Sequence, residues 1–460
     1  MRKIFSLGLL AAWALPLGIA AAEGETPNYR TVFPQSRIPE FKIVIEPADW
    51  AAMQANMREL FGDPGQGMPL PPVDPPRKPG EMPDFPKKKP MWVKAKVVFE
   101  GTEWPNVAVR YKGNSSLFSS WFRGSEKLPF KIDFEKFIDS GKRKFHGFQE
   151  LSLSNNFADD TYLREPLAYR VLGEMGQPAS HTALYRVVVD NGTGAKDYGL
   201  YTAIEVTSDT VVKRFFGEEE GNLYEGEGSG TTLAKNVTPE KIESSFEKEN
   251  NKKKADWSDV HGLHALLHDP RRLSDPAGWR ADLTQMFHVP GFLQWLAFGS
   301  VMEHWDAYGA MAHNFYLYNE KGKLQWISWD HNLILGADFG PPKKPFIPLP
   351  PGEPGKSPPG FPSPSFARTE VTEQWPLIRF LLDDPVINQE YQGALQAMRD
   401  QHFDAAKIEG ELHERAVLIR ASLPASAQAA YDESVNKLVA RIHEREQKLA
   451  EYLAGPKAGN

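Results

Sequence analysis

The chain has 460 residues, of which 41% are hydrophobic and 25% are charged, a composition typical of globular rather than disordered proteins. Its 53 basic and 60 acidic residues give a net charge of −7, which argues against a general nucleic-acid binder. The sequence contains no cysteine, so disulfides, thiolate nucleophiles and Cys-ligated zinc are excluded. The length predicts two or three domains, or one two-lobed enzyme.

The N-terminus has the pattern of a secretory signal peptide. A basic start is followed by an apolar run from Ile4 to Ala20, and an alanine triplet stands directly before Glu23. This predicts a signal peptide over residues 1–22 that is cleaved near Ala22, with an uncleaved membrane anchor as the alternative. No later stretch is long and apolar enough to span a bilayer. We therefore expect a secreted, periplasmic or cell-envelope protein without a stable membrane span.

The first half of the remaining chain predicts mainly strands. Alternating or β-branched patterns place them at residues 41–45, 93–99, 107–111, 130–134, 183–190 and 198–205. The last two are joined by Asn191-Gly192, a strong hairpin signal. Helices are predicted over 47–60, which begins with a proline, and after Asp160, where the pattern ends at Gly176.

Helices dominate from Asp256 onward. A buried helix begins at Pro290 and leads towards Asp306, and a hairpin then occupies residues 314–329. Residues 375–453 are almost entirely amphipathic helix. A β-rich first half and a helical second half together predict an α+β chain with two lobes.

This organisation divides the chain into consecutive parts. They are a signal peptide at 1–22, an N-terminal strand and helix at 37–60, a Pro/Gly-rich loop at 61–90, a β-rich N-lobe with one helix at 91–216, and a helical C-lobe at 217–455 that contains a Pro-rich insertion at 340–364. Both Pro-rich stretches are interpreted as surface insertions, with linkers, lids or docking segments as the alternatives.

Two aspartates stand at the ends of neighbouring elements in the second half. Asp306 follows the buried helix, and Asp330 comes directly after the second strand of the hairpin. The amide side chains of Asn314 and Asn332 lie near them in sequence. Oxygen ligands of this kind suit a hard divalent cation, so a metal site is predicted here. Alternatively, Asp306 caps a helix or turn and Asp330 forms a surface salt bridge.

Three histidines, His304, His313 and His331, fall in the same region, and zinc binding is one interpretation of them. No H-E-x-x-H or comparable spacing is present, and an isolated histidine is more often a structural group. We therefore expect these histidines to be structural.

A small polar loop follows the third predicted strand. Gly113 permits close backbone approach, while the hydroxyls of Ser115 and Ser116 could cradle phosphate oxygens. Lys127 and Lys131 come next and alternate with apolar residues, so both could reach a phosphate. Plain turn residues and solvated strand lysines are the alternative interpretation, and no Walker A sequence is present.

The order of these parts matches the order needed for phosphoryl transfer from ATP and Mg²⁺ in protein-kinase-like folds. Over residues 37–453 the sequence resembles the CotH kinase family, the spore-coat-protein-H-like atypical protein kinases. The matching stretches are Lys112-Gly113-Asn114-Ser115-Ser116, Lys127-Leu128-Pro129-Phe130-Lys131-Ile132, Tyr162-Leu163-Arg164, Tyr198-Gly199-Leu200-Tyr201 before Glu205, Gly221-Asn222-Leu223-Tyr224, Asn314-Phe315-Tyr316-Leu317-Tyr318, and Trp329-Asp330-His331-Asn332 before Gly336. Each is short, but their shared order is specific.

The resemblance implies roles for the matching residues. Asp306 would lie in the catalytic loop, Asp330 would bind Mg²⁺ or Mn²⁺, and Asn314 and Asn332 would belong to the same metal environment. Lys127 would neutralise the nucleotide phosphates as the catalytic lysine. The residues implied in ATP binding are Lys112, Gly113, Asn114, Ser115, Ser116, Lys131 and Glu205, the last of them near the adenine at the junction of the lobes.

Two positions depart from the family pattern. Lys112 stands where the family usually has arginine, which weakens any bidentate contact with phosphate. Asn332 replaces the second aspartate of the usual W-D-x-D motif, which removes one negative charge from the metal environment.

The resemblance implies an exported atypical protein kinase that transfers the γ-phosphoryl group of ATP to Ser or Thr of a protein substrate. One alternative is a catalytically silent, CotH-like pseudokinase that serves as an envelope or surface assembly module. A second is a metal-dependent hydrolase built on Asp306, Asp330 and His304. We expect no nucleic-acid partner, and the sequence specifies neither the physiological substrate nor the oligomeric state.

Overall fold

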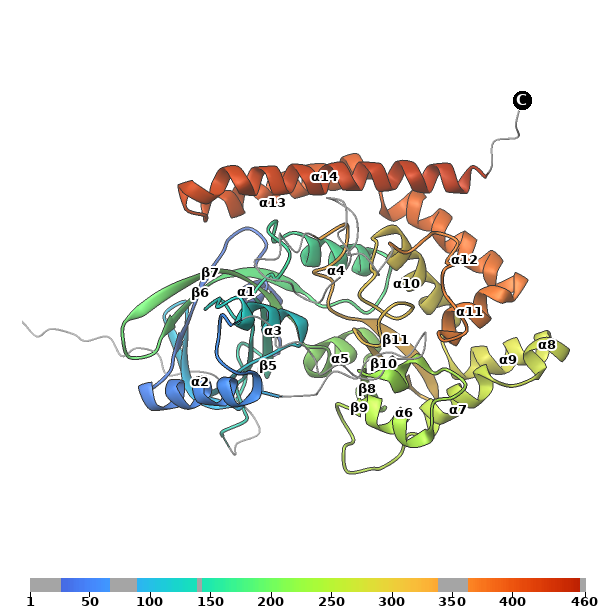
Figure 1. Cartoon of the computed structure of the whole chain (residues 1–460), viewed down its shortest axis with the longest axis horizontal. Helices are drawn as coiled ribbons and strands as arrows, with labels where there is room; N and C mark the ends of the chain where they lie inside the picture. The colour runs from blue at the N-terminus through green and yellow to red at the C-terminus, as the bar shows by residue number, and fades with distance from the viewer. Residues whose placement is uncertain (1–25, 67–88, 139–142, 338–362, 456–460) are drawn as a thin grey trace, which may run out of the picture.

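The structure is a computed structural model that describes residues 26–66, 89–138, 143–337 and 363–455. The predicted signal peptide at 1–22 and most of both Pro-rich stretches lie outside the described residues. In the part of the chain that is described, no helix combines the length and the apolar character needed to cross a membrane. A β-rich N-terminal region lies beside a helical C-terminal region, which confirms the predicted α+β class (Figure 1).

Seven strands close into a barrel in the N-terminal region. They are β1 (Glu40–Val44), β2 (Val93–Phe99), β3 (Thr102–Tyr111), β4 (Phe130–Asp133), β5 (Glu150–Ser154), β6 (Thr182–Asp190) and β7 (Ala195–Ile204). Their order around the barrel is β1-β2-β3-β4-β5-β7-β6, and parallel pairing of β1 with β6 closes it. The sequence patterns predicted every strand except β5, together with the hairpin between β6 and β7.

Alternate side chains of these strands fill the barrel, as the two-residue period of a strand requires. Aromatic rings from three strands meet inside it: the ring centres of Phe41 and Tyr185 are 5.5 Å apart, and those of Phe99 and Tyr185 are 5.4 Å apart. All three residues are fully buried. The barrel interior is therefore a packed core.

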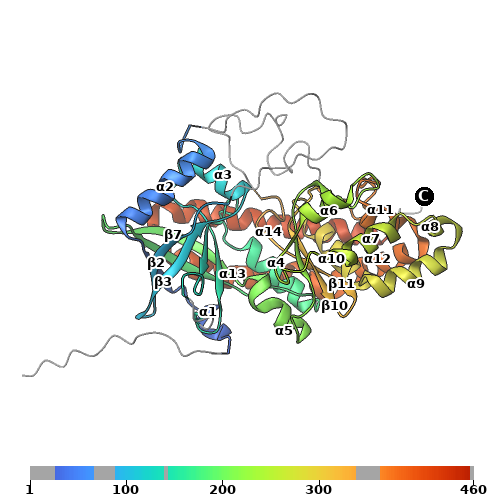
Figure 2. The same ribbon diagram turned by 90° about the horizontal axis from the view of Figure 1, so that it is seen from below.

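Five helices accompany the barrel strands in the chain. They are α1 (Tyr29–Val32), α2 (Pro47–Phe61), α3 (Ser115–Phe122), α4 (Arg164–Glu174) and α5 (Val212–Phe216), with a π-helical turn at Thr207–Val211 before the last. Helix α3 was not predicted, because its serines are weak helix formers and resemble a loop. It lies beside α2 (Figure 2), and the indole N–H of Trp121 donates to the carbonyl of Gly62 at 2.9 Å.

The C-terminal region contains a second, four-stranded antiparallel sheet in the order β11-β10-β8-β9. Its strands are β8 (Leu223–Gly226), β9 (Phe246–Lys248), β10 (Phe315–Glu320) and β11 (Lys323–Ser328). The predicted hairpin is β10 and β11, joined by Lys321 and Gly322. Both turn residues have positive φ, 51° and 94°, as a type I′ turn requires.

Helices make up the rest of this region. They are α6 (Pro239–Ser245), α7 (Ser258–Leu267), α8 (Arg271–Ser274), α9 (Pro276–Met286), α10 (Val289–Val301), α11 (Pro376–Asp383), α12 (Pro385–Ala397), α13 (Ala405–Ala421) and α14 (Ala425–Leu453), with short 3₁₀ and π turns at Ser229–Thr232 and Met398–His402. The long helix α14 runs along one edge of the molecule, past the barrel at one end and past α10 and α12 at the other (Figure 1).

Helix α4 connects the two regions. It lies between β5 and β6 in the chain, yet its buried Leu167, Val171 and Leu172 belong to the core of the helical region. Its first residue, Arg164, forms a buried ion pair of 2.8 Å with Asp159, and its Nε donates to the carbonyl of Ile334 at 3.0 Å. The start of α4 is thereby fixed against the loop that follows β11.

A buried carboxylate at the end of β7, Glu205, ties the N-terminal segment to the barrel. It accepts hydrogen bonds from the hydroxyls of Tyr29 at 2.9 Å and Thr210 at 2.6 Å. The backbone N–H of His181 at 2.9 Å and the Nη2 of Arg214 at 2.8 Å complete the network. Burial alone would raise the pKa of Glu205, but these donors and the charge of Arg214 lower it to about 2.

We expect Glu205→Gln to reduce the free energy of unfolding by about 3 kcal/mol at pH 7, because it removes one partner of a buried charge pair. The pKa of Glu205 is lower in the folded protein than in the unfolded chain, where a glutamate has a pKa near 4.3. Its charge therefore stabilises the fold fully above that pH, and this contribution is lost as the pH falls towards 2. The stability gap between wild type and variant should therefore narrow below about pH 4.5.

Denaturant unfolding between pH 7 and pH 3 measures this gap. Glu59→Gln, on the exposed face of α2, is the control and should match wild type throughout. A gap that stays constant with pH would show that Glu205 does not stabilise the fold through its charge.

Candidate active site

Five charged side chains meet where the barrel faces the C-terminal region. They are Lys112 after β3, Glu165 in the first turn of α4, Asp306 after α10, His313 before β10, and Asp330 after β11. Asp330 interacts electrostatically with Lys112, Asp306, His313 and Glu165. We call these five residues the charged cluster. The fold thus brings the two predicted aspartates together, from segments that are separated in sequence by a hairpin.

Lys112 supplies the positive charge that faces Asp330. Its Nζ donates to the hydroxyl of Ser152 at 2.8 Å and lies 5.7 Å from the ring centre of Trp329. Burial lowers the pKa of Lys112, and the carboxylates of Asp330 and Glu165 oppose that effect. The half-buried ammonium of Lys112 has further protons that it could donate to a phosphate.

Two carboxylates of the charged cluster have a raised pKa. Burial raises the pKa of Asp330, the charge of Asp306 adds to this, and Lys112 and His313 oppose it. Burial also raises the pKa of Glu165 to about 8, with a further increase from Asp330 and a decrease from Lys112.

Asp306 is ionised and held in place by two neighbours. Burial alone would raise its pKa, but His313 and Asn314 more than offset this and lower it. The Nε2 of His313 lies 2.8 Å from Oδ1 of Asp306, and the amide of Asn314 donates to Oδ2 at 3.2 Å and to the Asp306 carbonyl at 2.7 Å. His313 is thus a partner of Asp306.

The backbone adopts an uncommon conformation next to these groups. Asp330 has φ +58° and Asn314 has φ +66°, both in the left-handed region, which Asp and Asn enter more readily than most other non-glycine residues. The backbone N–H of Trp329 donates to the carbonyl of Asn314 at 3.1 Å, which links the two segments. Such conformations cluster where surrounding structure fixes a side chain for a function.

His304 and His331 form a contact between the loops that carry the two aspartates. Their ring centres are 4.8 Å apart, both rings are buried, and none of their ring nitrogens has a hydrogen-bond partner. Burial lowers the pKa of His304 to about 4 and that of His331 well below its ordinary value, so both rings are neutral. They act as apolar packing surfaces behind the charged cluster.

Asn332 uses one end of its amide to hold a backbone group. The side chain is buried, and its Nδ2 donates to the carbonyl of Phe157 at 2.9 Å. Its backbone N–H also lowers the pKa of Asp330 by hydrogen bonding. Only the amide oxygen of Asn332 is left for the predicted contact with a metal.

The predicted phosphate loop leads into helix α3. Gly113 has φ +87°, and a Cβ there would lie 2.7 Å from Oγ of Ser116. Ser115 and Ser116 form the first turn of α3, and the amide of Asn114 donates to the carboxylate of Glu227 after β8. The loop thus connects the barrel to the second sheet beside the charged cluster.

The two predicted strand lysines lie in different surroundings. Lys131, on β4, forms an ion pair of 3.0 Å with Glu150 and contributes to the electrostatic environment of Lys112. Lys127 lies 5.0 Å from the ring centre of Tyr162 and 5.3 Å from that of Tyr201. Burial lowers its pKa to about 8.

The negative charges of Asp160 and Asp159 oppose the lowering of the Lys127 pKa by burial. Neither belongs to the charged cluster. Lys112 rather than Lys127 is therefore the lysine that the fold brings to Asp330.

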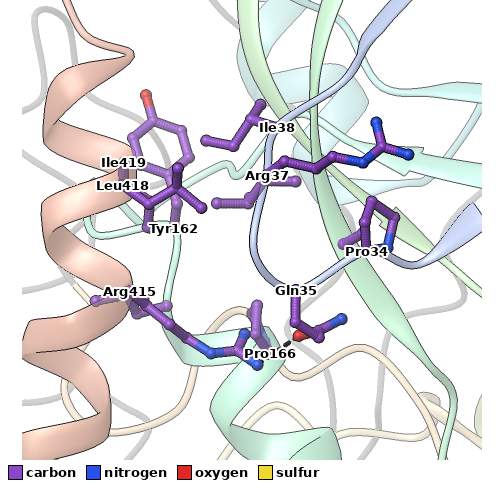
Figure 3. A pocket seen from close by; sticks show the side chains of 12 residues that line it. Pro34, Gln35, Arg37, Ile38, Tyr162, Pro166, Arg415, Leu418 and Ile419 are labelled. Atoms are coloured by element: carbon purple, nitrogen blue, oxygen red, sulfur yellow. Dashed lines mark hydrogen bonds between the residues drawn. The ribbon is translucent and has the colours of Figure 1, made fainter. Parts of the chain in front are cut away.

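Two further features lie apart from the charged cluster. The partners of Glu205 are Tyr29, His181, Thr210 and Arg214, so its carboxylate is already engaged on both oxygens. A cavity of about 20 Å³, shown in Figure 3, lies between the N-terminal segment, α4 and α13. It holds about one water molecule and is far too small for a nucleotide.

Sequence reasoning missed Glu165. A glutamate in the first turn of a helix usually indicates a favourable interaction with the helix dipole, and nothing local distinguishes Glu165 from that case. The nearest signal was the run Tyr162-Leu163-Arg164, which was recognised as the opening of a helix.

The oxygen donors fit a magnesium ion that arrives with a nucleotide. Among the described residues, no three His, Cys, Asp or Glu side chains form a group that could hold a metal ion. Magnesium is usually bound by one or two carboxylates together with substrate phosphates and water. Asp330 and the amide oxygen of Asn314 match that incomplete donor set, whereas a resident zinc site would need more protein ligands.

Known proteins resemble this chain to different degrees. The model of the family described as CotH kinase protein matches residues 109–456. No curated protein matches the chain. One solved structure, the Shewanella oneidensis MR-1 toxin–antitoxin system HipA, HipB and its operator DNA complex, is 13% identical, with a TM-score of 0.30, over 71% of this chain and 61% of that one. The chain thus covers less than two thirds of that protein, and so loose a similarity supports no conclusion.

The family match covers most of the sequence, and the whole charged cluster lies inside it. It begins within β3 and ends just after α14. The chain therefore belongs to the CotH kinase family, and it is a kinase-like protein.

Proposed function

We propose that the protein is an atypical protein kinase that transfers the γ-phosphoryl group of ATP to Ser or Thr of a protein substrate. The observation that carries the proposal is the charged cluster, in which Asp330 interacts electrostatically with both Asp306 and the half-buried Lys112. Phosphoryl transfer needs this combination, because positive charge must offset the phosphates while carboxylates hold the cation and orient the acceptor.

Each residue has a distinct role in this proposal. Lys112 offsets phosphate charge, and Asp330 holds Mg²⁺ or Mn²⁺ together with the amide oxygen of Asn314. When bound, the cation neutralises charge on the phosphates. Glu165 stabilises the ammonium of Lys112 in the absence of nucleotide, since it is one of the two carboxylates that raise the pKa of Lys112.

Asp306 orients the acceptor hydroxyl in this scheme. Its pKa lies below the ordinary value, so it is a weak proton acceptor but a reliable negative charge at neutral pH. The contacts with His313 and Asn314 fix its carboxylate in one orientation. Positioning of the hydroxyl accounts for a large part of the rate in such reactions.

The signal-peptide pattern of residues 1–22 supports action outside the cytoplasm, in a secreted, periplasmic or cell-envelope setting. The second candidate function, a silent assembly module of the same family, is favoured by Asn332, because it lacks one carboxylate and directs its amide to Phe157. The hydrolase interpretation has less support, since the ring of His304 is buried against His331.

Incubation of the mature protein with ATP and Mg²⁺ or Mn²⁺ separates these functions. A kinase labels itself or an added protein substrate, a hydrolase releases phosphate without labelling protein, and a silent module binds nucleotide without turnover.

We expect Asp330→Ala to abolish metal-dependent ATP binding, because it removes the carboxylate that faces Lys112. Asp306→Ala should keep ATP binding within about threefold and reduce turnover by about 10³-fold, since it removes only the positioning group. Calorimetric titration and phosphate labelling measure the two effects. Asp282→Ala, on the exposed face of α9, is the control. Equal loss of binding in both variants would contradict the separate roles.

Lys112→Met should weaken ATP binding by about tenfold or more, as expected for loss of a charge-assisted contact. Lys127→Met should change it by less than about threefold, because the charges near Lys127 are those of Asp159 and Asp160. The two half-buried lysines serve as controls for each other. The opposite ranking would assign the phosphate contact to Lys127.

Asn332→Asp is expected to reduce the free energy of unfolding by about 1–3 kcal/mol, because a carboxylate oxygen would face the carbonyl of Phe157 without a proton to share. The metal concentration needed for ATP binding should not fall. Asn332→Ala loses the hydrogen bond without adding charge. It therefore separates the effect of the lost hydrogen bond on stability from the effect of the added charge. A lower metal requirement with unchanged stability would mean that residue 332 turns towards the cation.

A further inference from the structure

The backbone turns sharply three residues before Asp306. Helix α10 ends at Val301, and the N–H of His304 donates back to the carbonyl of Gly299 at 2.8 Å. Between them Glu303 adopts φ +55°, in the left-handed position that glycine usually occupies after a helix. A glutamate at this position carries backbone strain, so its side chain must be held by something else.

Two arginines of α14 hold that side chain. Glu303 is buried, and Nε of Arg441 donates to its Oε2 at 2.7 Å while Nη2 of Arg441 contacts its Oε1. Nη1 of Arg445 lies 3.7 Å from the same Oε1. A buried carboxylate is tolerated only when paired, so this contact fixes Glu303 and the turn around it.

Arg445 also binds the end of α10 directly. Its Nη2 donates to the carbonyl of Ser300 at 2.5 Å, and its Nε donates to the carbonyl of Val301 at 3.2 Å. The last carbonyls of a helix lack partners within it and form the negative end of its dipole, which favours a cation there. Helix α14 therefore satisfies the end of α10 and the residue that follows it.

The loop that carries Asp330 is attached to the same point. The N–H of Leu335 donates to the carbonyl of Met302 at 2.9 Å, next to Glu303. At its other end the α13–α14 hairpin reaches the barrel, where Nη2 of Arg186 contacts the carbonyl of Ser422. Helix α14 thus spans from the barrel, which supplies Lys112, to the loops of both aspartates (Figure 1).

We infer that Arg441 and Arg445 are positioning residues that set the place of Asp306 through Glu303. The expected effect on turnover rests on the proposed function. The expected effect on the order of residues 303–308 does not, because it concerns the loop itself. Neither arginine needs to touch substrate for this role.

Glu303→Asn in the mature chain tests the inference. Asparagine tolerates the left-handed conformation, so the variant removes the charge without straining the turn further. Amide hydrogen exchange of residues 303–308 should become at least tenfold faster, beyond any change at amides elsewhere in the helical region, and the thermal midpoint should fall because Arg441 loses its buried partner. In the phosphate-labelling assay, kcat should fall by about 10- to 100-fold and KM for ATP should change by less than about threefold, because binding of nucleotide is set by Lys112 and Asp330.

The control is Arg420→Ala, which breaks a bidentate pair with Asp432 of 3.0 Å in the same hairpin and should leave both readouts unchanged. If Glu303→Asn unfolds, the double variant with Arg441→Met removes the unpaired arginine and should show the same faster exchange. Unchanged exchange of 303–308 in a folded variant, or an equal change in Arg420→Ala, overturns the inference. Absence of labelling in wild type would refute the kinase proposal alone, since exchange still decides the role of the arginines.

Discussion

The rest of the structure depends on one constraint at the junction of the barrel and the helical region. Side chains of opposite charge are removed from water there, so they must be placed next to one another. Lys112, Glu165 and Asp330 come from β3, α4 and the end of β11, and each would be costly to bury alone. Their charges compensate only when the three elements are held in one arrangement. These three residues therefore contribute both to the contact between the two regions and to the candidate site.

Local patterns were sufficient to predict most elements but not how they join. The alternation in β2 is visible because one face of the strand is buried and the other is not. Closure of the barrel depends on pairing between Phe41 and Val187, which no local period can indicate. Helix α3 was missed because Ser115, Ser116 and Ser119 have weak helical preference, and burial of Trp121 against α2 decides the outcome.

The sequence predicted those site residues that directly follow a recognisable helix or strand. Asp306 and Asp330 each follow an element with a clear pattern, and the fold brings them together. Glu165 was not predicted, because its burial results from packing of α4 against residues far along the chain. The choice among lysines was equally out of reach: Lys112 and Lys127 both lie beside strand segments, and only the assembled fold places one of them next to Asp330.

Closure of the barrel by β1 and β6 has a consequence for how the chain folds. The strands β1 and β6 lie far apart in sequence. Their pairing therefore requires a long loop to close, which costs conformational entropy before the contact becomes favourable. Until β6 is in place, β1 and β7 both present open edges that can pair with other chains. Since α4 lies between β5 and β6 yet packs in the helical core, we expect barrel closure and assembly of that core to be coupled during folding.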